Sequence, residues 1–168
     1  MDLACNPVDL DQCFAQARAA FPEAVPLALL RMSEDHIHLV HGAGAEPPGA
    51  TQLRLGYRSL ADACISHWPP APIELERAID LAEDQLMLAT PPLRGATLVA
   101  TDDIVRRLLA GSLSRSAQTM SMTTEEVEQV FQRMASVSLG HPLSHVGPVT
   151  NRYDAAALLL LRELMHHW

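Results

Sequence analysis

An apolar segment late in the sequence constrains the fold more than any other feature. Seven consecutive apolar residues run from Ala155 to Leu161, in a stretch of helical spacing that begins at about Arg152. Four of them are leucines at positions 158–161, and they leave no polar face in the middle of a helix. The run is far too short to span a bilayer. We therefore predict a helix that is covered on both sides at the centre of a core, with no membrane association.

Strand-type and helix-type segments are mixed along the rest of the chain. A β-hairpin is predicted from residues 25–31 and 36–41, which flank a turn, and a third strand is predicted over 51–55. Another strand is expected at 96–100, and the other segments have helical periodicity. The expected order is one helix, three strands, two helices, one strand and three helices. The predicted class is therefore α/β, with helices packed on a small mixed β-sheet.

Two of the predicted helices carry local signals. Residues 73–87 place Leu75, Ala78, Ile79, Ala82 and Leu86 on an apolar stripe, so acids on the other side of this helix are expected to face solvent. These acids are Glu76, Asp80, Glu83 and Asp84. Thr123 and Glu126 form the pattern of a capping box, and Met122 is placed to pack on Val127.

Length and cysteine usage predict one domain in a reducing compartment. The 168 residues fit a single domain, with residues 1–22 as an N-terminal helix and lead-in that starts at the cap Asn6-Pro7. Cys5, Cys13 and Cys64 are odd in number and lack metal-ligand spacing, so we interpret them as reduced thiols. The N-terminus does not resemble a signal peptide, and we expect a cytoplasmic protein.

Charge argues against nucleic acid as a partner. The net charge is −8, and a surface this acidic repels phosphate backbones. All 12 basic residues are arginine, a pattern typical of a GC-rich bacterial genome because arginine codons are GC-rich.

Besides the acids of residues 73–87, which could hold a divalent cation or act as general acid and base but are expected to face solvent, histidines form a second group of candidate metal ligands. His36 and His38 alternate on the second predicted strand and so point to one face, with His41 close by. His141, His145 or the pair at 166–167 would have to complete such a site. No Cys or carboxylate stands at ligand spacing, so we expect a solvated strand face and assign no metal or cofactor.

Other candidates for chemistry are weaker still. The connector 111–116 is small, polar and basic, but it lacks the glycine spacing and lysine of a P-loop. Nucleophile-elbow, zinc-protease and dinucleotide motifs are absent, and Cys64 is expected to be an inert core thiol. We therefore assign no catalytic residue.

Several phrases resemble the second half of the exopolyphosphatase / guanosine pentaphosphate phosphatase (Ppx/GppA) family. These phrases occupy residues 53–60, 73–87, 122–127 and 152–158, in the family's order and spacing. The resemblance implies one half of an actin-like (ribonuclease H-like) ATPase fold. In this interpretation residues 23–168 are a phosphatase-like half-domain.

The family's phosphate-binding motifs are where this sequence departs from the pattern. Where the family has an Asp, a Gly-rich turn and a Ser, this chain has residues 31–36, which include Glu34 and Asp35. Where the family's second loop ends in Gly-Thr, this chain continues into Asp102 and Asp103. Gly-rich turns let backbone N–H groups approach a phosphate, whereas these carboxylates repel it and are expected to satisfy the helix ends themselves.

Two functional hypotheses follow. The first is a non-catalytic binding or interaction protein, a degenerate Ppx/GppA phosphatase-like half-domain whose open apolar edge implies a homodimer or a protein partner. The alternative is a hydrolase, either metal-dependent through His36 and His38 or a phosphatase that acts with a partner chain.

Overall fold

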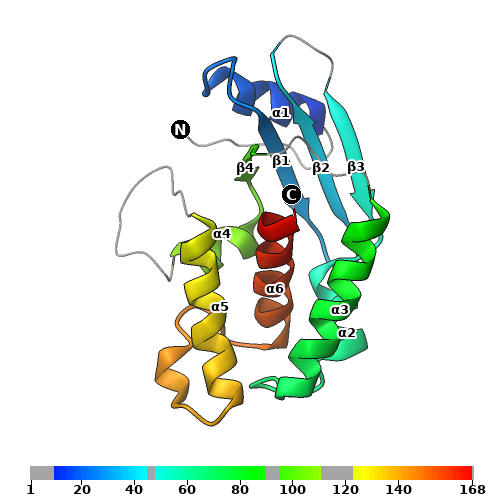
Figure 1. The fold of residues 1–168 in the computed structure, drawn as a ribbon. Helices are drawn as coiled ribbons and strands as arrows, with labels where there is room; N and C mark the ends of the chain where they lie inside the picture. Colours follow the sequence, from blue (N-terminus) through cyan, green and yellow to red (C-terminus); the bar gives the residue numbers. More distant parts are fainter. Residues whose placement is uncertain (1–9, 45–47, 90–94, 111–122, 168) are drawn as a thin grey trace.

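The computed structural model describes residues 10–44, 48–89, 95–110 and 123–167. Its elements follow the predicted order (Figure 1). The strands are β1 (Leu27–Met32), β2 (Ile37–Gly42), β3 (Gly49–Leu53) and β4 (Thr97–Ala100). The helices are α1 (Leu10–Ala19), α2 (Tyr57–Cys64), α3 (Pro72–Leu88), α4 (Asp103–Ala110), α5 (Thr124–Ser138) and α6 (Arg152–His167), with a 3₁₀ turn at Leu143–His145.

The four strands form one mixed sheet in the order β3-β2-β1-β4. β2 pairs antiparallel with both β1 and β3, while β4 runs parallel to β1. The predicted mixed sheet and its hairpin are therefore confirmed. The third strand ends at Leu53, two residues earlier than predicted, because Gly56 turns the chain into α2.

Helices cover both faces of the sheet. Leu30, Ile37 and Leu39 point into a large core shared with α2 to α6. Leu27 and Leu29 alternate to the other face, where they pack against Phe14 of α1. β1 is buried on both faces along most of its length, and for this reason Leu27–Leu30 form a continuous apolar run. β2 is less apolar, with His38 and His41 half-buried.

Helix α6 lies at the centre of the larger core, as predicted. It packs against α2, α3, α4 and α5, and every residue from Ala155 to Leu161 is buried. No helix in the described part of the chain is long and apolar enough to cross a membrane.

Helix α3 buries the predicted face, with one exception. Leu75 and Leu86 are buried with Ala78 and Ala82 between them, whereas Ile79 is only half-buried. The buried row follows a spacing of three and four residues through the alanines, which allow close approach to the neighbouring helices.

The carboxylate of Glu74 is also buried on α3, which the sequence did not predict. It accepts hydrogen bonds from the backbone N–H groups of Ser66 and Ala71, each 2.8 Å long, and it contacts Nδ1 of His67. Burial alone would raise the pKa of Glu74, but these hydrogen bonds outweigh burial and lower it. The side chain thereby fastens the loop before α3 to the start of that helix.

Helix α5 begins with the predicted capping box. The backbone N–H of Glu126 donates to Oγ1 of Thr123, and the N–H of Thr123 donates to Oε2 of Glu126. The expected contact of Met122 lies outside the described residues. Glu128 then joins α5 to α6 by accepting hydrogen bonds from Arg162 and His166.

Glu128→Gln is expected to destabilise the protein at pH 7 and much less at pH 3. Burial raises the pKa of Glu128, but hydrogen bonds from Arg162, Gln132 and His166 lower it from 4.5 to about 2. Stability linked to a depressed carboxyl pKa is present above pH 4.5 and is lost as the pH falls toward the folded value. We expect a loss of roughly 1–3 kcal/mol at pH 7, measured by urea denaturation.

The exposed Glu76→Gln serves as the control for charge removal. An equal loss of stability for Glu128→Gln at both pH values would contradict the assignment, because it would not depend on the carboxylate being ionised.

The cysteines differ from the expectation in one respect. Cys13 is buried against the sheet and is disulfide-bonded, so the interpretation of all three cysteines as reduced thiols is wrong for this residue. Cys64 is a free, half-buried thiol whose pKa is raised by burial. A protonated thiol is a poor nucleophile, which agrees with the predicted inert role.

Candidate functional site

The carboxyl ends of β1 and β4 lie at one edge of the sheet, because these two strands are parallel. In open α/β sheets this is the edge at which ligands bind. The edge is formed by the hairpin turn after β1, the start of α4 after β4, and the first turns of α2 and α6. It contains both segments in which the sequence departs from the Ppx/GppA pattern, residues 31–36 and the segment with Asp102 and Asp103.

The hairpin turn caps α2 with its own backbone. The carbonyl oxygen of Ser33 accepts from the N–H of Tyr57, and that of Glu34 accepts from the N–H groups of Arg58 and Ser59. These are the first N–H groups of α2, which otherwise lack partners within the helix. The N-terminus of α2 is therefore fully used inside the protein.

Gly56 makes this close contact possible. A Cβ atom at this position would lie 2.4 Å from the backbone of Glu34 and 2.4 Å from the carbonyl oxygen of Ser33. Any larger residue would push the turn and the helix apart.

Carboxylates at this edge do not play the capping role that the sequence analysis expected. Glu34 caps α2 through its backbone carbonyl, while its side chain pairs with Arg58 at 2.8 Å. Oδ2 of Asp102 accepts the N–H of Met32 at 2.7 Å, which links the end of β1 to the start of α4. Burial raises the pKa of Asp102, partly offset by this hydrogen bond.

Arginine and tyrosine side chains cover the outside of the same edge. The guanidinium groups of Arg58 and Arg152 lie 5.1 and 4.7 Å from the ring centroid of Tyr153. Arg152 also contacts Asp62 at 2.6 Å. Both cations are thus already paired with a carboxylate and an aromatic face.

Asp154 is a buried carboxylate that sequence reasoning missed. Its Oδ2 atom accepts hydrogen bonds from the N–H and hydroxyl of Thr150 and from the amide of Asn151, and Arg107 lies 3.4 Å from Oδ1. Oδ1 of Asn151 caps α6 by accepting from the N–H groups of Tyr153 and Asp154. The signal was an Asp three residues after an Asn, directly before an apolar helix.

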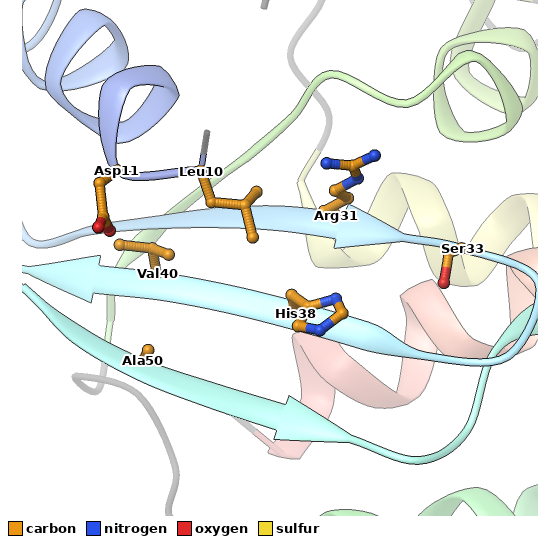
Figure 2. A pocket seen from close by; sticks show the side chains of 7 residues that line it. All are labelled: Leu10, Asp11, Arg31, Ser33, His38, Val40 and Ala50. Carbon is orange, nitrogen blue, oxygen red and sulfur yellow. The ribbon is translucent and has the colours of Figure 1, made fainter. Parts of the chain in front are cut away.

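A pocket of about 470 Å³ opens on the opposite face of the sheet, beside α1 (Figure 2). Arg31 and His38 are register partners on β1 and β2, and Asp11 reaches the pocket from α1. Leu10, Val40 and Ala50 supply its apolar lining. Ser33 also lines it, but its hydroxyl donates to the carbonyl of His36, so it is not paired with His38 as a nucleophile with its base.

The three candidate histidines do not converge. The rings of His36 and His38 stack with their centroids 6.0 Å apart. Burial, His36 and Arg31 together lower the pKa of His38. His41 lies on the other face of β2, where its Nε2 atom is 3.4 Å from Oγ1 of Thr51, so it does not share the face of the pair.

The acids of α3 divide into two groups. Glu76, Asp80 and Asp84 are exposed, as predicted, whereas Glu83 is half-buried and lies beside Glu163 and His167 of α6.

The connector 111–116 lies outside the described residues.

Comparisons with known proteins bear on the fold. No protein-family model matches the sequence, and no curated protein matches it. Two crystal structures of the Aquifex aeolicus Ppx/GppA protein match 90% of this chain and 53% of theirs, at 16% identity, with TM-scores of 0.65 and 0.66. An exopolyphosphatase-like protein matches 83% of this chain and 48% of its own, at 12% identity, with a TM-score of 0.58.

The chain has the fold of about half a Ppx/GppA protein. This confirms the predicted resemblance and the predicted actin-like architecture of a mixed sheet with packed helices. At 16% identity the likeness establishes the fold alone, and the chain spans about half the length of these structures.

Proposed function

We propose that this chain is a non-catalytic binding or interaction module, a Ppx/GppA-like half-fold whose phosphate site has been replaced by internal contacts. The capping of α2 by the hairpin turn carries the proposal. The N–H groups of residues 57–59 are the donors that a phosphate at this edge would need, and all three already bind the carbonyls of Ser33 and Glu34.

The charges at the same edge support this proposal. The segments that meet there carry Glu34, Asp35, Asp102 and Asp103, and the nearby Arg58 is neutralised by Glu34. Phosphoryl transfer depends on positioning and on stabilising negative charge, so an enzyme would need free donors or cations here.

We propose further that the chain binds a protein partner or a second copy of itself. Met87 and Leu88 at the end of α3 are 79% and 82% exposed, and Leu139 and Leu143 are exposed at the end of α5 and after it. The ends of α3 and α5 lie at opposite ends of the helical layer, so these residues offer two separate small apolar surfaces of the kind used in protein contacts (Figure 1). Light scattering of the pure protein tests the homodimer. We also propose that the protein is located in the cytoplasm.

A phosphatase that acts with a partner chain is the second candidate. It is favoured by the chain's coverage of only about half of the Ppx/GppA structures. A hydrolase that uses His36 and His38 has less support, since His41 lies on the other face of their strand.

We expect the isolated protein to bind ATP·Mg²⁺ with an affinity no tighter than about 1 mM and to release no phosphate from polyphosphate or guanosine pentaphosphate. The physical reason is that the N-terminal donors of α2 are occupied. Calorimetric titration and a phosphate-release assay check the two parts.

The double variant Glu34→Gln/Asp35→Asn is the matched control. It removes two negative charges but leaves the backbone carbonyls in place, so it should also fail to bind. Micromolar binding by either protein, or enzyme-dependent turnover, would contradict the proposal.

A further inference from the structure

Three side chains with metal-ligand chemistry meet between α3 and α6, away from the edge described above. Glu163 and His167 are four residues apart on α6 and so share one face of the helix. Helix α3 lies beside α6 and brings Glu83 to the same place (Figure 1). One ligand atom from each side chain lies within 4.8 Å of the other two.

The two distances from His167 fit a metal better than they fit hydrogen bonds. Nε2 of His167 is 3.5 Å from Oε1 of Glu83 and 3.5 Å from Oε2 of Glu163. A hydrogen bond between nitrogen and oxygen would be about 2.9 Å long. Ligand atoms around a tetrahedral zinc, with bonds of about 2.0–2.2 Å, stand roughly 3.3–3.6 Å apart.

Glu163 is already held in place for such a role. Its side chain is 2% exposed, and its other oxygen, Oε1, accepts from Nη1 of Arg162. Arg162 is fixed in turn by Glu128 of α5. Carboxylates that bind metals are commonly held in this way, by a hydrogen bond to the oxygen that does not face the metal.

Charge and ligand type indicate which metal would bind. Glu83 and Glu163 bring carboxylate oxygens within 4.8 Å of each other, and Arg162, which pairs with Glu163, is shared with Glu128. A divalent cation would offset the remaining negative charge. An imidazole nitrogen with carboxylate oxygens suits zinc and similar transition metals, whereas magnesium and calcium prefer oxygen ligands alone.

We propose that Glu83, Glu163 and His167 bind one zinc ion, which joins the last turn of α6 to α3 and leaves a fourth position for water. This site is independent of the proposed function and of the His36–His38 pair. Spacing along the chain does not join position 83 to positions 163 and 167, because only the packing of α3 on α6 brings them together.

The test is zinc titration of tag-free protein that has first been treated with a chelator. We expect one equivalent of zinc to bind, with a rise in melting temperature on binding. Cobalt in place of zinc should give the visible absorption of a tetrahedral site. His167→Ala should weaken zinc binding by at least about 100-fold, since loss of a residue that only hydrogen-bonds to a ligand already costs about 10–100-fold.

Two control variants make the assignment specific. His166→Ala removes the neighbouring histidine, which contacts Glu128 and not the three proposed ligands, and should change the zinc affinity by less than about threefold. His38→Ala should have no effect. Because His167 is partly exposed, its replacement should leave the fold intact, which circular dichroism verifies.

Absence of zinc binding by the folded wild-type protein would overturn the proposal. Zinc binding that survives His167→Ala, or that is lost with His38→Ala instead, would also overturn it.

Discussion

Leu159→Ala is expected to lower the free energy of unfolding by about 2–5 kcal/mol. The side chain of Leu159 has no exposed surface, and it lies in the middle of α6, the helix that α2, α3, α4 and α5 surround. Shortening it removes buried methyl groups and leaves a cavity that four packed helices can close only in part.

Urea denaturation of the wild type and the variant measures this loss. Leu139→Ala is the matched control, because it makes the same chemical change at a residue that is 74% exposed, and it should shift stability by no more than about 0.5 kcal/mol. A similar loss for the two variants would show that α6 is not the centre of the core.

Gly56→Ala is expected to cost about 2–4 kcal/mol of stability. The new Cβ would lie 2.4 Å from the backbone of the hairpin turn, which cannot rotate away as a side chain can. The turn must move, and the hydrogen bonds from Arg58 and Ser59 to Glu34 would lengthen or break. The substitution therefore tests the same contact that carries the proposed function.

Gly49→Ala provides a control with a different kind of neighbour. Its Cβ would approach the ring of His41 at 2.7 Å, and a ring on a side chain can rotate out of the way. We expect a smaller loss for Gly49→Ala than for Gly56→Ala, measured by thermal and urea unfolding. The reverse order would contradict the assigned contact between Gly56 and the turn.

The proposed module differs from a phosphatase through its hydrogen bonds more than through its fold. The N-terminus of a helix at a sheet edge is an anion site only while its N–H groups are free. Here the carbonyl groups of the turn 33–36 accept hydrogen bonds from the first N–H groups of α2, and Asp102 accepts one from the N–H of Met32. The same fold can therefore use these N–H groups for hydrogen bonds within the protein, which leaves none of them for a ligand.

Local patterns in the sequence determined the elements and the centre of the core. The apolar run 155–161 predicted a covered helix, and Thr123 with Glu126 predicted a helix start; both are confirmed. Hairpin and strand positions also followed from short segments. Such signals depend on residues within a turn or two of one another, which is why periodicity and capping rules detect them.

Contacts between distant segments were decided only by the tertiary structure. The capping of α2 joins Glu34 to residues 58 and 59, and the bond from Met32 to Asp102 spans 70 positions. The proposed zinc ligands are likewise separated by about half the chain. No local pattern reports which carbonyl, carboxylate or imidazole will meet across such separations, because the packing of whole helices and strands brings them together.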